Sequence, residues 1–401
     1  MKTEALLARR ASRLPPTAAA TATPDHHPIS FDSGHAFPGV LPDLTSEAER
    51  ALTACRAETL QYAPRPGLPE LRDWIVEYMR RDGVANASLE ETFVTNGAKH
   101  ALELVCRLLL EEGDAIVVTA PTYFTAIPIF KSFAVEFIEV SQDGNGLNVS
   151  ELEHLLSERK RAGRPGPKFI YDIPDFHNPS GVTMSRERRE TLLALAEKNN
   201  ILVIEDSPYR RVRFEGESQP LLKALDRSNS VLTLGTFSKL LAPGLRIGWV
   251  SGPRDLLNRM IQLKSDGGSC PLTQRIIFEF CSRGRLDSHI ERVQKVYRAH
   301  RDRMVAAIRQ QLPGVSLVVP QGGYYVWPTL PEPVDGDVLA SRAASDGVIL
   351  IPGSKFFAAS GGSLSGGKAP KNHVRLAYSH ATPAEIDAGL ERLGKIYRSM
   401  N

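Results

Sequence analysis

The stretch Leu234-Gly-Thr-Phe-Ser-Lys-Leu-Leu-Ala-Pro-Gly-Leu-Arg-Ile-Gly-Trp-Val250 decides both the fold and the chemistry of this sequence. Apolar runs at residues 230–234 and 247–250 predict two buried strands, with an apolar turn between them. This turn carries two hydroxyls and two cations: Thr236, Ser238, Lys239 and Arg246. A lysine buried beside another cation has a lowered pKa and can form a Schiff base, and hydroxyls with an arginine can hold a phosphate. A surface loop with a solvated lysine explains the stretch equally well, so the rest of the chain has to decide.

The composition is that of a globular protein of ordinary charge. The 401 residues suffice for a large domain and a smaller one, with 42% hydrophobic and 24% charged residues. A formal net charge of +3 favours neither a nucleic acid nor a membrane surface as a partner. No apolar run reaches the roughly 18 residues of a membrane helix, and the basic N-terminus lacks an apolar signal core. The four cysteines are scattered and give no metal site, so we expect a cytoplasmic protein without a metal.

Strand and helix patterns alternate along the first part of the chain. Strands are expected at 92–95, 115–119, 135–140, 169–173 and 201–204, and helices at 46–59, 68–81, 152–159 and 186–199. This alternation predicts an α/β architecture, a mostly parallel sheet flanked by helices. After residue 250 the pattern becomes helical, and short strands are expected at 316–319, 324–327, 348–351 and 373–379. The last part therefore predicts a smaller α+β domain.

These patterns divide the chain into four parts. We expect a flexible N-terminal arm, a segment that joins the small domain, a large ligand-binding domain and a small C-terminal domain. Their bounds are 1–28, 29–50, 51–285 and 286–401.

Polar and aromatic side chains follow the ends of the expected strands: Tyr123, Asn178, Asp206, Tyr209, Thr236 and Lys239. Ligands of open α/β sheets bind beyond the carboxyl ends of the strands, so we expect these side chains to share one site. Gly97 and Ala98 form a glycine turn at the start of a helix, where backbone N–H groups can bind an anion.

The chemistry of these residues fits one cofactor. A Schiff-base lysine and an anion site suggest a carbonyl compound that carries a phosphate. Asp206 could keep a ring nitrogen protonated, so that the ring withdraws electrons from a carbanion. Asn178 and Tyr209 could bond a ring hydroxyl, and Tyr123 could stack on the ring. These requirements describe pyridoxal 5'-phosphate (PLP).

Eight motifs carry a family resemblance: Tyr62-x-Pro-x-x-Gly67, Thr95-Asn-Gly-Ala98, Pro121-Thr-Tyr123, Pro174-Asp-Phe-His-Asn-Pro-Ser-Gly181, Glu205-Asp-x-x-Tyr209, Thr236-Phe-Ser-Lys239, Pro243-Gly-Leu-Arg-Ile-Gly248 and Val374-Arg-Leu-Ala-Tyr-Ser379. In this order the chain resembles the fold-type-I PLP enzymes, and among them the class I/II aminotransferases of the 2-aminoadipate and kynurenine aminotransferase branch. The resemblance runs from Ile29 to the C-terminus. Each motif alone is weak, whereas the set in this order and spacing is specific.

The resemblance implies a role for each residue. Lys239 would be the catalytic residue, holding PLP as an aldimine and moving a proton between the substrate Cα and the cofactor. Asp206 would bind the pyridine nitrogen, Asn178 and Tyr209 the ring oxygen, and Tyr123 would stack on the ring. The residues expected at the phosphate are Gly97, Ala98, Lys99, Thr236, Ser238, Arg246 and Tyr62 of the partner subunit. Arg375 would clamp the substrate α-carboxylate, with Asn178 and Gly34 also touching the substrate. Because the family is dimeric with shared sites, we expect a homodimer.

The chain departs from the family pattern in two places. Relatives usually have Ser-Gly-Ser-Gln-Gln where this chain has Asn96-Gly-Ala-Lys-His100, so a hydroxyl is lost at Ala98 and a cation appears at Lys99. His177 replaces a glutamine beside Asn178, and it is either a titratable group near the reaction or a packing residue that points away. The possible pocket residues His35, Phe37 and Lys99 do not identify the substrate.

The resemblance favours an aminotransferase that moves an amino group from an L-amino acid to a 2-oxo acid. The alternative is a biosynthetic PLP enzyme that catalyses elimination, replacement, cyclisation or annulation through the same quinonoid intermediate. A third interpretation is the PLP-sensing domain of a transcriptional regulator, which would follow a winged-helix module. The 28 low-complexity residues before the resemblance are too few for that module, so small-molecule substrates are expected and nucleic acid is not.

Overall fold

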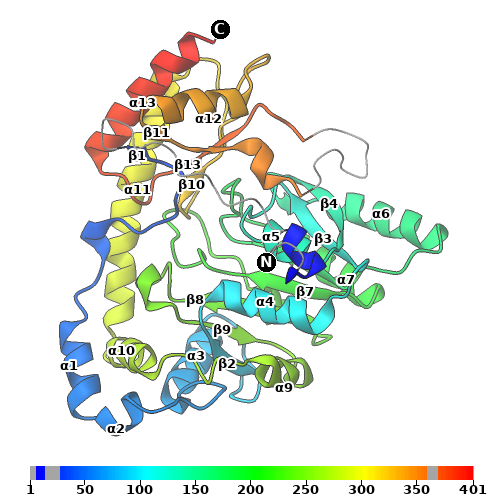
Figure 1. The fold of residues 1–401 in the computed structure, drawn as a ribbon, viewed down its shortest axis with the longest axis vertical. Coiled ribbons are helices and arrows are strands. Elements are labelled where there is room, and N and C mark those ends of the chain that lie inside the picture. Colours follow the sequence, from blue (N-terminus) through cyan, green and yellow to red (C-terminus); the bar gives the residue numbers. More distant parts are fainter. Residues whose placement is uncertain (1–5, 14–27, 359–368, 401) are drawn as a thin grey trace.

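An eight-stranded sheet forms the centre of the computed structural model, which describes residues 6–13, 28–358 and 369–400 (Figure 1). The strand order is β2-β9-β8-β7-β6-β3-β4-β5. The strands are β2 (Thr92–Thr95), β3 (Ala115–Ala120), β4 (Glu136–Asp143), β5 (Gly146–Leu147), β6 (Phe169–Asp172), β7 (Leu202–Asp206), β8 (Val231–Thr236) and β9 (Gly248–Ser251). β3 is parallel to β4 and β6, and β7 is parallel to β6 and β8. At the two edges of the sheet, β9 is antiparallel to β8 and to β2, and β5 is antiparallel to β4. The carboxyl ends of β3, β6, β7 and β8 therefore lie at one edge of the sheet.

Helices cover both faces of this sheet because successive strand residues point to opposite sides. In β3, Ala115 and Val117 belong to the apolar core under α6 (Val149–Arg161) and α7 (Arg186–Lys198). Ile116 and Val118 belong to the core on the other face. The helices there are α4 (Ala98–Leu109), α5 (Ile127–Ser132) and α9 (Arg254–Leu263). Burial on both faces explains why the strands read as continuous apolar runs.

The C-terminal part packs three helices against a small sheet. The helices are α11 (Arg285–Gln311), α12 (Gly336–Ser345) and α13 (Pro383–Arg398), and the sheet has the order β10 (Tyr325–Val326), β13 (Val374–Ala377), β12 (Ile351–Pro352). The long helix α11 runs along one side of the molecule, from α10 (Pro271–Ser282) to α13 (Figure 1). The remaining helices are α1 (Thr45–Thr53), α2 (Arg56–Thr59), α3 (Pro69–Arg81) and α8 (Leu222–Leu225). No helix in the described ranges combines the length and apolar character needed to span a membrane.

Residues 29–35, which we call the N-terminal strap, are held by the C-terminal part. β1 (Ile29–Ser30) pairs in parallel with β11 (Val348–Ile349). The backbone N–H of Phe31 donates to Ile349 O at 2.7 Å, and that of Ala377 donates to Phe31 O at 2.8 Å. The phenyl ring of Phe31 is fully buried in the main core. The strap thus joins residues from opposite ends of the chain.

The structure confirms most expected elements and corrects those at 46–59, 316–319 and 348–351, the last of which is divided into β11 (Val348–Ile349) and β12 (Ile351–Pro352). The helix expected at 46–59 is divided into α1 and α2, because the chain turns at Ala54 and Cys55. The strand expected at 316–319 is wrong: Ser316 makes only an isolated bridge to Thr329. Val318 is 62% exposed, so its β-branched side chain follows no burial pattern there. Of the expected flexible arm, residues 6–13 include a short 3-10 helix whose Arg13 donates to Glu112 at 2.9 Å, and residues 14–27 lie outside the described residues.

Candidate active site

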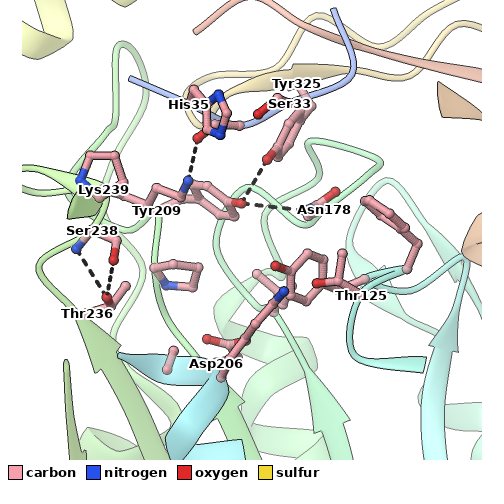
Figure 2. A pocket seen from close by; sticks show the side chains of 18 of the residues that line it. Ser33, His35, Thr125, Asn178, Asp206, Tyr209, Thr236, Ser238, Lys239 and Tyr325 are labelled. Carbon is pink, nitrogen blue, oxygen red and sulfur yellow. Dashed lines mark hydrogen bonds between the residues drawn. The ribbon is translucent and has the colours of Figure 1, made fainter. Parts of the chain in front are cut away.

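A cavity of about 590 Å³ lies at the carboxyl edge of the central sheet (Figure 2). Most of the predicted site residues line it: Gly34, Ala98, Lys99, Tyr123, Asn178, Asp206, Tyr209, Thr236, Ser238, Lys239, Arg246 and Arg375. His35 also lines the cavity. The expectation that the strand ends converge is therefore confirmed. The reason is that β3, β6, β7 and β8 are parallel and end at this edge.

Lys239 follows β8 and reaches across the cavity to the N-terminal strap. Its Nζ donates to the backbone oxygen of Gly34 at 2.5 Å and lies 5.0 Å from the centre of the Tyr324 ring. Burial, with a smaller contribution from the cations Arg375, Arg246 and Lys99, lowers the pKa of Lys239 to about 8. A substantial fraction of this amine is therefore neutral, and nucleophilic, near neutral pH.

Asp206 is the last residue of β7 and holds a carboxylate at the floor of the cavity. Its Oδ2 accepts a hydrogen bond from Tyr171 at 2.7 Å, while Oδ1 is buried and has no protein partner. Burial raises the pKa of this carboxyl to about 6, against the Tyr171 hydrogen bond, which lowers it. A cationic N–H placed at Oδ1 would satisfy this oxygen and keep the carboxylate ionised.

One end of the cavity is built to hold an anion. Thr236 Oγ1 lies 3.0 Å from Ser238 Oγ, and Arg246 Nη1 donates to Ser238 Oγ at 3.3 Å. The first turn of α4 adds free backbone N–H groups beside Ala98. Gly97 precedes this turn at φ 89°, and a Cβ there would lie 2.9 Å from Arg246 Nη2. Glycine is required because it lets the backbone and the guanidinium approach each other.

Asn178 and Tyr209 face each other on the wall of the cavity. Asn178 Nδ2 donates to the Tyr209 hydroxyl at 3.4 Å, and that hydroxyl donates to Tyr325 at 3.3 Å (Figure 2). Asn178 Oδ1 accepts from Arg375 Nη1 at 3.0 Å. These bonds link four segments of the chain: the loop after β6, the loop after β7, β10 and β13.

Arg375 lies on β13 and is almost fully buried. Its guanidinium is surrounded by aromatic rings at 4.1, 5.1 and 5.2 Å, those of Tyr325, Phe356 and Phe124. Nη2 also donates to the backbone oxygen of Asp32, in the N-terminal strap. Among the described residues no carboxylate pairs with it, and its Nε has no hydrogen-bond partner, so this buried cation can clamp a substrate carboxylate.

Some predicted residues do not meet in the cavity. Tyr62 is 85% exposed and absent from the cavity lining. Gly97 lies just behind the lining, against Arg246. Phe37 packs against His300 instead. His177 points away from the cavity: its Nδ1 lies 3.3 Å from Ser180 Oγ and its Nε2 lies 3.5 Å from Asp172 Oδ1.

Several further lining residues were not predicted from the sequence, among them Phe124, Ile173 and Tyr325. Each is an apolar or aromatic residue inside or beside a strand or turn, where core packing is the ordinary explanation. Tyr325 comes from the C-terminal part, and only the tertiary structure places it against Arg375 and Tyr209.

Comparisons with known proteins support one family. Residues 29–393 match the family "Aminotransferase class I and II". An aromatic-amino-acid aminotransferase of Thermococcus litoralis is 36% identical, over 92% of this chain and 87% of the relative. An uncharacterized HTH-type transcriptional regulator of Bacillus subtilis is 30% identical, over 93% of this chain and 74% of the relative. The crystal structure of Pyrococcus horikoshii kynurenine aminotransferase in complex with PMP has a TM-score of 0.90 and 30% identity, covering 100% of this chain and 98% of that chain.

The cavity fits the PLP of this family. The unpartnered Asp206 Oδ1 suits a protonated ring nitrogen, and the hydroxyls with Arg246 suit a phosphate. The buried amine of Lys239 lines the same cavity and can react with an aldehyde. The match over 29–393, together with this donor set, leads to one conclusion: the chain belongs to the class I and II aminotransferases and is a PLP-dependent enzyme of fold type I.

Proposed function

We propose that this aminotransferase uses Lys239 as its catalytic residue and takes aromatic L-amino acids as amino donors to a 2-oxo acid. The observation that carries the assignment of Lys239 is its place in one cavity with Asp206 and Arg375. The aromatic donor class is supported by the names of two similar proteins, an aromatic-amino-acid aminotransferase and a kynurenine aminotransferase.

In this proposal the residues divide the work along the cavity. Bound PLP supplies an aldehyde carbon that combines with amines and a ring that withdraws electrons from the substrate Cα. Asp206 Oδ1 holds the proton on the ring nitrogen, which requires an ionised carboxylate. Lys239 Nζ would accept the proton from the substrate Cα, which requires a neutral amine, and would then donate it to the cofactor. A pKa of about 8 lets this amine do both near neutral pH.

Other residues bind and orient. Thr236, Ser238, Arg246 and the start of α4 bind the phosphate, and Lys99 adds a cation at the same end. Tyr123 stacks on the ring, and Asn178 and Tyr209 donate to the ring oxygen. Arg375 binds the α-carboxylate through its fork of N–H groups. Gly34 places its backbone oxygen against Lys239 and so bounds the substrate space.

We also propose a homodimer in which Tyr62 of the partner subunit reaches the phosphate. The support is the 85% exposure of Tyr62, together with the exposed leucines Leu41, Leu52 and Leu60 in the same part of the chain. Light scattering on the purified protein should give about twice the mass of the chain, which is 44.1 kDa. The division into parts 1–28, 29–50, 51–285 and 286–401 and the cytoplasmic location stay predictions from the sequence.

The test of the function uses the absorption spectrum of the bound cofactor. The purified holoenzyme is mixed with single amino acids: phenylalanine, tyrosine, kynurenine, 2-aminoadipate and alanine. Aromatic donors should convert the cofactor to its amine form fastest, and a 2-oxo acid should convert it back. Preference for 2-aminoadipate or alanine would contradict the donor class. Release of ammonia or of a side-chain fragment without any 2-oxo acid would favour the alternative elimination or replacement chemistry.

A further inference from the structure

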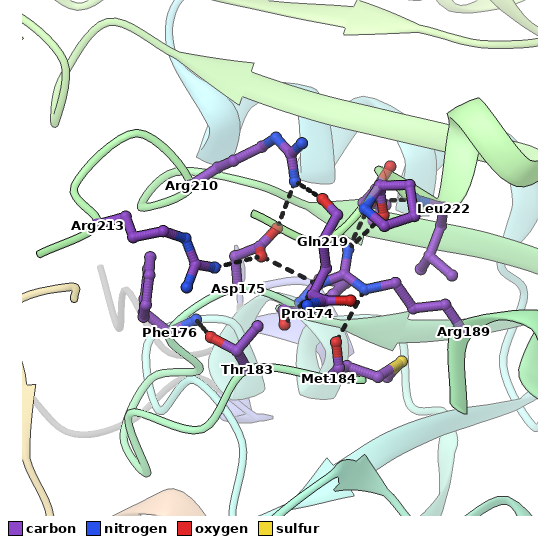
Figure 3. Close-up of polar contacts among 12 residues, drawn as sticks. Pro174, Asp175, Phe176, Thr183, Met184, Arg189, Arg210, Arg213, Gln219 and Leu222 are labelled. Atoms are coloured by element: carbon purple, nitrogen blue, oxygen red, sulfur yellow. Dashed lines mark hydrogen bonds and ion pairs between the residues drawn. The ribbon is translucent and has the colours of Figure 1, made fainter. Parts of the chain in front are cut away.

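Asp175 lies behind the candidate active site, and its carboxylate meets three arginines (Figure 3). Oδ1 accepts from Arg189 Nη2 at 3.0 Å and lies 3.6 Å from Arg213 Nη2, and Oδ2 accepts from Arg210 Nη1 at 3.3 Å. Asp175 is only 1% exposed. A buried carboxylate among buried guanidiniums is tolerated only when the charges are paired, so the removal of this one group affects all three arginines.

Arg189, on α7, fixes the loop that contains Asp175 and Asn178. Its side chain donates to the backbone oxygens of Pro174 and Met184, both at 3.0 Å. The two ends of the loop are therefore tied to the same guanidinium as Asp175. Asn178 follows Asp175 by three residues within this loop.

Arg210 and Arg213 come from the segment that contains Tyr209. Arg210 directly follows Tyr209 and is itself held by Asp82, at 2.6 and 3.1 Å. The Arg213 guanidinium stacks on the ring of Phe176, 4.6 Å from its centre. Phe176 directly follows Asp175 and belongs to the same loop as Asn178. Asp175 therefore joins the loop of Asn178 to the segment of Tyr209, and it does not itself line the cavity.

The direct contact between Asn178 and Tyr209 is weak by comparison. Their hydrogen bond is 3.4 Å long and joins two neutral groups, whereas hydrogen bonds in proteins cluster near 2.9–3.0 Å. Hydrogen bonds between ionised groups are roughly twice as strong as neutral ones. The charged contacts at Asp175 therefore tie the two segments together more strongly than the Asn178–Tyr209 bond does.

We propose that Asp175 is a positioning residue: it sets the spacing of Asn178 and Tyr209 and hence the strength of the hydrogen bonds that both donate to the cofactor's ring oxygen. This inference rests on the proposed function, in which these two side chains bind that oxygen. A ring oxygen that receives weaker hydrogen bonds keeps more negative charge, and it holds a proton at Lys239 Nζ more firmly.

The test titrates the visible absorption band of the bound cofactor in the holoenzyme. Asp175→Asn keeps the shape of the side chain and removes its charge. The midpoint of the band, the pH at which half of the absorption change has occurred, should rise by about 0.5 unit or more in Asp175→Asn. In Asp175→Glu, which keeps the charge, the midpoint should lie closer to the wild-type value. Arg213→Gln removes one arginine and the stacking on Phe176, and it should cause a smaller shift in the same direction. It also provides the test if Asp175→Asn yields no folded holoenzyme.

Glu136→Gln is the matched control, because it also breaks a partly buried arginine pair, with Arg159 at 3.0 Å, at the start of β4. It should lower the melting temperature and leave the band midpoint unchanged. If the folded Asp175 and Arg213 variants lose stability like this control and keep midpoints within about 0.1 unit of wild type, Asp175 is merely structural and the proposal is overturned.

Two further variants separate this proposal from the proposed function. Asn178→Ala and Tyr209→Phe remove the donors themselves and should shift the band midpoint directly. If they do so and Asp175→Asn does not, only the positioning role of Asp175 fails. If neither donor variant moves the midpoint, the placement of the ring oxygen is wrong, and the inference about Asp175 fails with it.

Discussion

The Lys239 amine of the cofactor-free protein should titrate near pH 8, well below the 10.5 of an ordinary lysine. Burial is the main cause, and the neighbouring cations Arg375, Arg246 and Lys99 add to it. Replacement of one exposed cation, in Lys99→Met, should therefore raise the pKa of Lys239. The reactivity of the amine at neutral pH should fall accordingly.

The size of the effect follows from the two pKa values. At pH 7 an amine with a pKa of 8 is about 9% neutral, whereas one with a pKa of 10.5 is about 0.03% neutral. Lys239 should thus present about 300 times more nucleophile than an ordinary lysine at this pH. This difference corresponds to about 3.4 kcal/mol at 1.36 kcal/mol per unit.

Competitive acylation measures this value directly. The apoprotein is treated with a trace of acetic anhydride between pH 6 and 11, and mass spectrometry follows the peptide that contains Lys239. Lys198, with a largely exposed side chain on α7, provides the reference rate in the same sample. A midpoint for Lys239 above about pH 9.5, more than one unit from the expected value, would refute the reasoning. So would a lower midpoint in Lys99→Met.

Three further outcomes are expected. Burial lowers the pKa of His177 to about 3. Below pH 6.5 the unfolded chain therefore binds a proton at this histidine that the native state does not bind. Wild type should therefore lose about 1.2 kcal/mol of stability relative to His177→Gln as the pH falls from 6 to 5, and equal slopes in urea unfolding would contradict this. Gly97→Ala places a Cβ 2.9 Å from Arg246 Nη2 at φ 89° and should weaken cofactor binding about 10- to 100-fold in a fluorescence titration, whereas unchanged affinity would show that Arg246 does not hold the phosphate. Arg375→Lys loses the two-point fork and should raise the KM for amino donors at least about tenfold, and a normal KM would place the carboxylate elsewhere.

The sequence predicted the part of the site that parallel strands bring together. Asp206 and Thr236 end β7 and β8, and the register pairs Asp206 with Leu234, so their proximity follows from strand topology alone. Lys239 follows from the same argument because it lies three residues beyond β8. Position in a regular element is thus enough to place these residues.

The rest depends on packing between distant segments, which no local pattern records. Tyr325 meets Arg375 only because β10 pairs with β13 beside the large sheet. The expected strand at 316–319 failed for the related reason that β propensity reports a half-buried surface, and Val318 is exposed. His177 could not be oriented in advance, because its direction depends on Ser180 and Asp172 in the folded loop.

The N-terminal strap has a consequence for the order in which the protein can be made. Its Gly34 supplies the oxygen that Lys239 contacts, yet the strap itself is held by residues near the other end of the chain. Arg375 reaches Asp32 over 343 positions, and Ser379 reaches His35 over 344. Synthesis on the ribosome proceeds at about 5–20 residues per second from the N-terminus. The strap is therefore synthesised early, but it can take its place at the cavity only when nearly the whole chain has been made. The central sheet can form earlier, so a nascent chain should bind the cofactor firmly only after β11 and β13 have emerged.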